Sequence, residues 1–204
     1  FVYENNLLRV YYCYMPKFPN LELKEFQLES KDYDLDKWLQ SCTEETHWVE
    51  GHIKLFGKIH KIPRLQSWYA DKGIQYSYSG KSLKRNDWNN TLSEIKNAIE
   101  ELSDKNFNSV LMNLYRNGND SMGLHSDDEK ELGEFPVIAS LSLGAPRKIF
   151  FKHKFKKINF NINQNHGAVL VMSGETQKYW KHEIKKEKKI VLPRVNLTFR
   201  NIIS

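Results

Sequence analysis

The sequence predicts an α+β fold in which two N-terminal helices support one sheet of a β-sandwich or jelly roll. Two segments in the first half repeat apolar residues at spacings of three and four, the period of an amphipathic helix. From residue 107 onward, short apolar runs alternate with turns, and we predict strands at 107–115, 137–143, 147–153, 158–162, 167–172, 179–184 and 194–203. Helices followed by a run of strands are typical of this fold class.

The composition indicates one folded domain. Of 204 residues, 40% are hydrophobic and 13% aromatic, which is enough for a substantial core without disulfides or structural metals. We expect a single domain over 1–204. Within it we place an extension and a helix in about 1–50, hairpins in about 51–85, and the jelly-roll core in about 107–204.

Cysteine usage and charge limit the compartment and the partners. Cys13 and Cys42 form neither a disulfide framework nor a metal-binding motif, which is typical of a reducing compartment. No apolar run approaches the roughly 18 residues of a membrane span, and no signal peptide opens the chain, so we expect an intracellular protein without membrane contact. The net charge is +6, and basic residues cluster in Lys148–Lys157 and Lys181–Lys189. These runs favour a polyanionic partner, although a solvated lysine-rich surface is the alternative.

The first half of the chain contains both predicted helices. Residues 1–30 are expected to form short strands and loops, including a strand at Leu7–Met15. Asp34 is suited to cap a helix that runs to about His47. Asp87 is predicted to cap the second helix. The apolar face of that helix is formed by Trp88, Leu92, Ile95, Ile99 and Leu102.

Two aromatic features lie between these helices. Residues 53–64 form two short alternating runs around Gly57, which predicts a hairpin, and Phe56 lies at its tip between lysines. An aromatic side chain at a hairpin tip is poorly placed to join a core. Tyr76 and Tyr78 are two residues apart between glycines, so both side chains would lie on one strand face. They either pack on the core or form a stacking platform.

A histidine and an aspartate are placed to hold a metal. His125 and Asp127 are two residues apart after a glycine-containing loop, and residues at this spacing project from the same face of an extended backbone. His182 is the candidate third ligand, because it lies on a predicted strand about a dozen residues before Arg194. Two histidines and one carboxylate form the facial arrangement that holds Fe(II) and leaves coordination positions open. Zinc accepts the same ligands. The other histidines are expected to be surface or structural residues: His47, His52, His60, His153 and His166.

The last strand has the strongest alternation in the sequence. Its odd positions are apolar, whereas its polar face contains Arg194, Asn196, Thr198 and Arg200. An amphipathic strand with its polar face in water is one interpretation. Two arginines with an amide and a hydroxyl are also suited to bind a carboxylate, and we favour this second interpretation. Asn113 and Tyr115 share a face of an earlier strand and add an amide and a phenol.

Taken in order, these residues resemble the AlkB family of Fe(II)/2-oxoglutarate dioxygenases, which are nucleic-acid dealkylases. The matching motifs are Asn113-x-Tyr115, His125-x-Asp127-x-Glu129, His182, Arg194-Val-Asn-Leu-Thr-Phe-Arg200, Phe56-Gly57-Lys58, Pro63-Arg64 and Tyr76-x-Tyr78-Ser-Gly80. The resemblance extends from about Gly51 to Ile203 and is closest to the duplex-DNA repair branch of animal nuclei. That branch has a bulky polar residue where this chain has Ser126, which affects the pocket rim and not a ligand.

The resemblance implies a double-stranded β-helix, which is a jelly roll, with a nucleotide-recognition lid in about 51–85. It implies that Fe(II) is held by His125, Asp127 and His182, with 2-oxoglutarate and O2 as co-substrates. The positions that match 2-oxoglutarate contacts are Asn113, Tyr115, Arg194, Asn196, Thr198 and Arg200. The far carboxylate of 2-oxoglutarate is expected to meet Arg194 or Arg200.

The implied reaction is oxidative dealkylation of N-alkylated DNA bases of the 1-methyladenine and 3-methylcytosine type. The alkyl carbon is hydroxylated as 2-oxoglutarate is decarboxylated, and an aldehyde is released. A base inside a duplex must be flipped out to react. We expect Phe56 to fill the gap, Tyr76 or Tyr78 to stack on the flipped base, and Glu129 to contact it. Arg64 and the lysine runs are expected to bind phosphates.

Expected partners are alkylated duplex and single-stranded DNA, with RNA left open. We expect a monomer in a bacterial cytoplasm or a eukaryotic nucleus. A related dioxygenase acting on RNA, a protein or a small molecule would keep the metal ligands and arginines but need neither Phe56 nor the basic runs. A non-enzymatic basic β-domain that binds nucleic acid would show no dependence on iron or 2-oxoglutarate.

Overall fold

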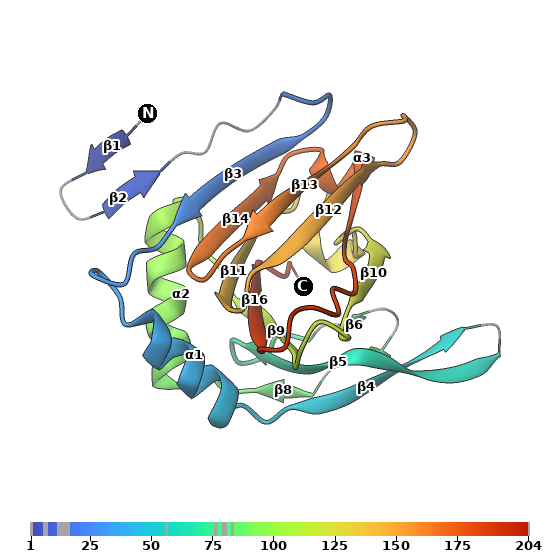
Figure 1. Cartoon of the computed structure of the whole chain (residues 1–204), viewed down its shortest axis with the longest axis horizontal. Helices are drawn as coiled ribbons and strands as arrows, with labels where there is room; N and C mark the ends of the chain where they lie inside the picture. The colour runs from blue at the N-terminus through green and yellow to red at the C-terminus, as the bar shows by residue number, and fades with distance from the viewer. Residues whose placement is uncertain are drawn as a thin grey trace.

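The computed structural model describes residues 2–5, 8–11, 17–55, 57–75, 77–78, 81–82 and 84–203, with the backbone alone in 2–5, 8–11, 54–55, 77–78 and 81–82. Its strands form two main sheets that pack face to face, and two helices cover the outer side of the larger sheet (Figure 1). The predicted α+β class with a jelly roll is therefore confirmed.

The larger sheet contains the strands nearest the helices. Its order is β3 (Glu22–Gln27), β14 (Ala168–Ser173), β11 (Ile138–Gly144), β16 (Arg194–Arg200), β9 (Ser109–Tyr115), β5 (Lys58–Ala70) and β4 (Val49–Leu55), and β8 (Arg85–Asn86) also pairs with β5. Neighbours are antiparallel except β5 and β8.

The smaller sheet completes the jelly roll. Its order is β10 (Met122–His125), β15 (Trp180–Ile184), β12 (Arg147–His153) and β13 (Asn159–Gln164). Outside the two main sheets lie β1 (Val2–Asn5) with β2 (Leu8–Tyr11), β6 (Ser77–Tyr78) with β7 (Lys81–Ser82), the single turn α3 (Thr176–Tyr179), and a 3-10 turn, Lys130–Leu132. All seven strands predicted after residue 107 are confirmed, with ends that differ by at most three residues.

Both predicted helices form, but one predicted cap is wrong. Helix α1 is Leu35–Glu44, and the Asp34 side chain accepts the Lys37 N–H at 3.0 Å as expected. Helix α2 is Asn90–Ser103, and its cap is Asn89, which accepts the Leu92 N–H at 2.7 Å. The expected cap, Asp87, instead pairs with Arg85 at 2.6 Å, because the chain is still extended beside β5 at that point.

The alternation in β16 divides the core into two layers. Val195, Leu197 and Phe199 are buried in a cluster with residues of α1 and α2. The four polar residues of the strand are buried as well, although they face away from the helices. A polar strand face in water is therefore excluded. Buried polar side chains need hydrogen-bond partners, which a bound ligand can supply, so this interior is the candidate location of a functional site.

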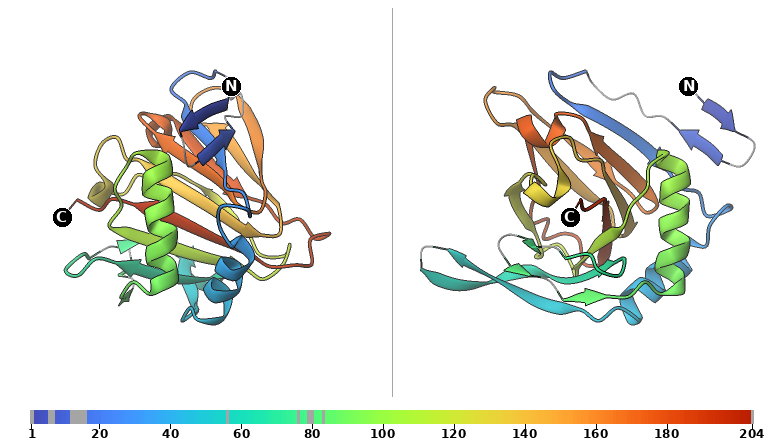
Figure 2. Two further views of the ribbon diagram at one scale, coloured as in Figure 1. Left: turned by 90° about the vertical axis from the view of Figure 1, so that its left-hand side faces the viewer. Right: turned by 180° about the vertical axis from the view of Figure 1, so that it is seen from behind.

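The β4–β5 hairpin extends beyond the body of the molecule (Figures 1 and 2). Gly57 has a φ of +79°, a left-handed conformation that favours glycine at the turn. Strand β5 is longer than predicted and continues through Pro63, close to where its register with β4 shifts. Among the described residues, no helix is long and apolar enough to span a membrane.

Candidate active site

Three predicted metal ligands come together at the end of β10. His125 pairs in register with His182 of β15, and Asp127 lies two residues after His125. One ligand atom from each of the three lies within 4.8 Å of the others. His125 Nε2 is 3.9 Å from Asp127 Oδ1, and His182 Nε2 is 3.7 Å from Asp127 Oδ2. Adjacent strands thus supply two imidazoles that share one carboxylate.

Neighbouring side chains fix the orientation of this triad. His125 Nδ1 lies 2.9 Å from the Gly123 carbonyl, so Nε2 is the nitrogen directed at Asp127. The Asp127 N–H donates to Gln177 Oε1 at 2.9 Å, and Arg200 Nη2 donates to Asp127 Oδ1 at 2.8 Å. Such partners orient metal ligands before the metal binds.

The protonation states suit a divalent cation. Burial would raise the pKa of Asp127, but the positive charge of Arg200 and the neighbouring His182 and His125 hold this pKa far below its usual value. Burial lowers the pKa of His125. Burial, followed by the charge of His125, lowers the pKa of His182 to about 3. At neutral pH the site therefore offers two neutral imidazoles and one carboxylate, the forms that bind metal.

A buried guanidinium lies at the other end of β16. Arg194 is 0% exposed, and it donates from Nε to Ser142 Oγ and from Nη2 to Asn196 Oδ1, both at 2.8 Å. Its Nη1 is buried with no hydrogen-bond partner among the described residues. An unpaired buried donor is costly, so this nitrogen fits an acidic ligand such as a carboxylate.

A cavity beside the metal triad is lined by the polar residues of β9 and β16. Its walls include Asn113, Tyr115, Ser140, Asn196, Thr198 and Arg200, together with His125, Asp127 and His182. Asn196 Nδ2 donates to Thr198 Oγ1 at 3.0 Å and to Ser140 Oγ at 3.2 Å. This network orders the polar face that the alternation predicted.

Asn113 is held by two residues of β5. Its Oδ1 accepts from Arg64 Nε at 2.8 Å and from Gln66 Nε2 at 3.1 Å, which leaves Nδ2 as a donor for the cavity. Arg64 is buried and also donates to the Ser121 carbonyl at 3.3 Å. This position does not support the expectation that Arg64 binds a DNA phosphate, because its guanidinium already orients Asn113.

Comparison with known proteins agrees with this geometry. The family model described as "2OG-Fe(II) oxygenase superfamily" matches residues 23–200. The chain belongs to this family. Fe(II), 2-oxoglutarate and O2 are therefore its metal and co-substrates, and the two imidazoles, the carboxylate and the unpaired Arg194 donor are suited to them.

Curated relatives of this oxygenase include human "DNA oxidative demethylase ALKBH2", 35% identical over 181 residues, with 83% of this chain and 69% of the relative covered. Human "Alpha-ketoglutarate-dependent dioxygenase alkB homolog 3" is 43% identical over 153 residues, with 70% of this chain and 53% of the relative covered. The chain thus spans between about half and three quarters of the length of its curated relatives. The solved structure "The structure of OsALKBH1" matches 92% of this chain and 100% of its own, with a TM-score of 0.61 at 16% identity. That match supports the oxygenase fold.

Arg147 is a buried residue of this oxygenase that the sequence did not single out. It directly precedes the first basic run, yet its side chain is 0% exposed and packs against the Tyr115 ring, with 5.4 Å from Cζ to the ring centroid. Gln66 was not singled out either, and Arg64 was predicted to bind phosphate rather than to orient Asn113. Their spacing of two in β5 was the available signal, since it places both on the face that meets Asn113.

Several predicted residues have no defined place at the oxygenase site. Phe56 and Tyr76 lie outside the described residues, and Tyr78 is described only as backbone in β6. Glu129 is half-buried two residues after Asp127, before the 3-10 turn.

The expectation that His153 and His166 are structural agrees with their contacts. His153 Nδ1 accepts two backbone N–H groups, and His166 Nδ1 accepts one.

Proposed function

We propose that this oxygenase repairs DNA by removing alkyl groups from N-alkylated bases of the 1-methyladenine and 3-methylcytosine type. The observation that supports the proposal is a His-Asp-His triad beside a polar cavity, in a chain whose relatives, 35% identical over most of its length, are named DNA oxidative demethylases. An intracellular location, in a bacterial cytoplasm or a eukaryotic nucleus, follows from this substrate. We expect the protein to act as a monomer.

The metal ligands would be His125, Asp127 and His182. Arg200 keeps the Asp127 carboxylate ionised and turned toward the two imidazoles. Bound Fe(II), with 2-oxoglutarate and O2, supplies the oxidation that hydroxylates the alkyl carbon. The hydroxylated adduct then loses an aldehyde and leaves the repaired base.

The far carboxylate of 2-oxoglutarate is assigned to Arg194 rather than Arg200. The charge of Arg200 is paired with the Asp127 carboxylate, whereas the side chains that Arg194 donates to, Ser142 and Asn196, are neutral. The buried Nη1 of Arg194 has no hydrogen-bond partner among the described residues. Asn113 would offer its Nδ2 to the co-substrate, and Tyr115, Asn196 and Thr198 would form the walls around it. Since charge-assisted hydrogen bonds contribute about 1.5–3 kcal/mol, loss of Arg194 should weaken 2-oxoglutarate binding by roughly ten- to a hundredfold.

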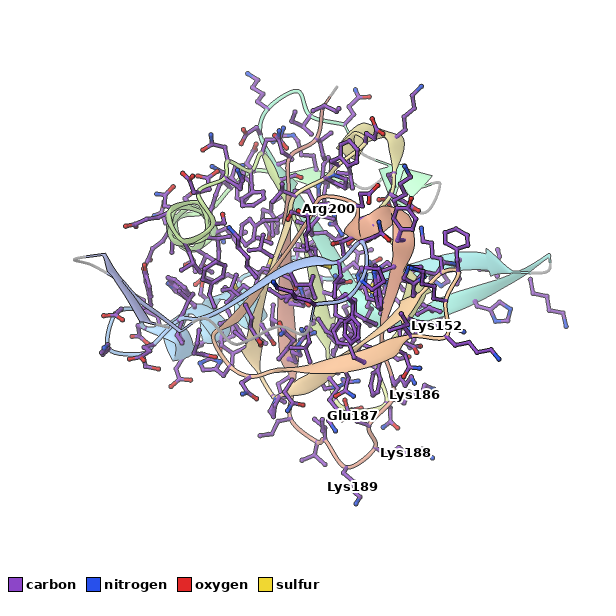
Figure 3. The ribbon with its side chains drawn as sticks, turned by 90° about the horizontal axis from the view of Figure 1, so that it is seen from above. Lys152, Lys186, Glu187, Lys188, Lys189 and Arg200 are labelled. Carbon is purple, nitrogen blue, oxygen red and sulfur yellow. The ribbon has the colours of Figure 1, made fainter. Side chains whose placement is uncertain are left out.

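The two lysine runs provide a surface for the DNA backbone. Lys152 of β12 and Lys181 of β15 are opposite one another in the register of the smaller sheet, and both are exposed. They line one hollow with Lys154, whose Nζ is 3.2 Å from Asp128 Oδ2, next to the metal ligand Asp127. In the view of Figure 3, Lys152 and the lysines at 186, 188 and 189 lie toward one side of the molecule. Phosphates held here would lie close to the metal triad.

Base flipping would use the projecting hairpin. Phe56, next to the Gly57 turn, would fill the space left in the duplex, and Tyr76 or Tyr78 would stack on the flipped base. Glu129, two residues after Asp127, would accept a hydrogen bond from an exocyclic amino group or favour a cationic alkylated base. Equal losses of duplex and single-strand repair in Phe56→Ala would argue against the wedge.

The repair proposal is tested by anaerobic reconstitution with Fe(II) and 2-oxoglutarate, then air and a duplex that contains one 1-methyladenine. Mass spectrometry should detect the demethylated base, and His125→Ala should abolish it. Single-stranded and RNA versions of the oligonucleotide measure strand preference. If 2-oxoglutarate is consumed but no lesion is repaired on any of these nucleic acids, the DNA assignment fails while the oxygenase class stands.

A further inference from the structure

We propose that Arg147 is a positioning residue for the far carboxylate of 2-oxoglutarate. The inference rests on the proposed placement of that carboxylate at Arg194. Arg147 is the first residue of β12, its side chain is 0% exposed, and it does not line the cavity beside the metal. Burying the charge of an arginine costs free energy unless several hydrogen-bond or ionic partners offset it. The contacts of Arg147 therefore indicate its role.

Arg147 and Arg194 both pack against the ring of Tyr115. The guanidinium carbon of Arg147 lies 5.4 Å from the ring centroid, and that of Arg194 lies 5.3 Å from it. Tyr115 is buried, lines the cavity and is opposite Arg194 in the register of β9 and β16. Contacts with two cations restrict how the phenol ring can move. Arg147 therefore limits the position of Tyr115, and through it that of Arg194.

Arg147 also joins two loops at this end of the barrel. It donates to the carbonyls of Asn117 at 3.4 Å, Asp120 at 2.9 Å and Lys185 at 2.6 Å, and its Nε is 3.3 Å from Glu187 Oε1. The same loops bond directly, because Gly118 donates to Ile190 and accepts from Glu187. A Cβ at Gly118 would collide with the Glu187 carbonyl, so the loops meet too closely for a larger residue. The guanidinium thus holds together the chain segments around Tyr115.

The two buried guanidinium groups leave this end of the barrel with an excess of positive charge. The pKa of Arg194 is lowered to about 10, mainly by burial; Tyr115 acts in the opposite direction, and the nearby charge of Arg147 adds to the lowering. Two carboxylates lie nearby: Asp120, which is buried and paired with Arg116, and Glu187, which pairs with Arg147 and is 29% exposed at its side chain. A carboxylate bound at Arg194 would offset this charge, which connects the position of Arg147 to recognition of a dianionic co-substrate.

The test compares two ligands that differ only in the far carboxylate. The dissociation constants of 2-oxoglutarate and of 2-oxopentanoate are measured by calorimetry on the anaerobic Fe(II) protein, without DNA or turnover. Arg147→Gln should weaken the binding of 2-oxoglutarate by roughly tenfold and leave the binding of 2-oxopentanoate unchanged. Arg194→Gln should show the same selectivity with a larger effect. Arg116→Gln is the matched control. It removes a guanidinium from the same loop that is bonded to Asp120 and is not one of the two cations over the Tyr115 ring, and it should change neither constant.

Arg147→Lys separates positioning from charge. The lysine keeps the charge but cannot reproduce the planar fork that bonds three carbonyls and Glu187. If Arg147→Lys behaves like Arg147→Gln, positioning is supported, whereas wild-type affinity in Arg147→Lys would overturn it.

Equal weakening of the binding of both ligands by Arg147→Gln, with Arg194→Gln still selective, would overturn the role of Arg147 alone. An unselective Arg194→Gln would overturn the carboxylate placement and this inference with it. If Arg147→Gln does not fold, Glu187→Gln should give the same selectivity at about two- to threefold, and an unselective or absent effect would count against the proposal.

Discussion

Arg194 and Arg200 occupy the same face of one strand, yet their partners give them different roles. Arg200 bonds to the carboxylate of Asp127, 73 positions away in the chain, whereas Arg194 donates to the neutral Ser142 and Asn196 side chains. The alternation of β16 predicted that both point inward, and the resemblance left the far carboxylate with either one. Only the pairing of distant strands decides between them, and this information is absent from the local sequence pattern.

Arg200→Gln should weaken metal binding by about ten- to a hundredfold, because loss of a residue that orients a metal ligand typically has this effect. Asp127 would remain buried without the guanidinium that stabilises its charge. Titration of the metal-free protein with Mn(II) measures the change. Arg194→Gln is the control and should bind Mn(II) like the wild type. Unchanged Mn(II) affinity in Arg200→Gln would show that Asp127 does not depend on Arg200.

The lowered pKa of His182 predicts how the stability of the metal-free protein depends on pH. Folding lowers the pKa of His182 from 6.5 to about 3, so the unfolded chain binds the proton more readily. The free energy of unfolding is therefore unaffected by His182 above pH 6.5. It decreases as the pH falls from 6.5 toward 3, by no more than about 1.4 kcal/mol per pH unit for this group. Urea unfolding between pH 7 and pH 4 measures the slope, which should be smaller in His182→Asn. Equal slopes in the two proteins would rule out the effect.

At the scale of elements, local patterns predicted most of the structure. Apolar spacing identified both helices, and short alternating runs identified seven strands, because a buried face imposes its period on the sequence. Local patterns did not reveal the length of β5. It pairs with β9 over Leu65–Ala70 only because strands far apart in the chain meet there. The metal site was predictable because its three residues, two histidines and one aspartate, form a recognised metal-binding set. The roles of Arg64 and Arg147 were not, because they depend on burial and on partners far away in the chain.

The corrected cap of α2 can be tested directly. Asn89→Ala should lower the free energy of unfolding by about 1 kcal/mol, because the Leu92 N–H loses its side-chain acceptor. Asp87→Ala should have a much smaller effect, since the Asp87 side chain is 85% exposed in its pair with Arg85. Urea denaturation of both variants makes the comparison. A larger loss in Asp87→Ala would restore the cap expected from the sequence.

At the scale of the whole molecule, folding brings the two lysine runs to the same sheet. Lys152 and Lys181 are 29 positions apart in the sequence but opposite one another between β12 and β15. The two amphipathic helices cover the larger sheet, so the outer face of the smaller sheet is left for this charge. The sequence showed the two runs, but their meeting in one hollow depends on the order of strands in the sheet.

This arrangement predicts how DNA binding depends on salt. Each phosphate neutralised by a lysine adds about −0.9 to the slope of log K against log salt concentration, because counterions are released from the DNA. Lys152→Gln and Lys181→Gln should each reduce the magnitude of the slope by about 1 and weaken all sequences alike. Lys37→Gln makes the same charge change on α1, at the outer side of the larger sheet, and should leave the slope unaltered. Fluorescence anisotropy with a labelled duplex between 50 and 200 mM salt, roughly the range over which such binding changes most, makes the measurement. Equal slopes in all three variants would mean that the DNA backbone crosses another face of the protein.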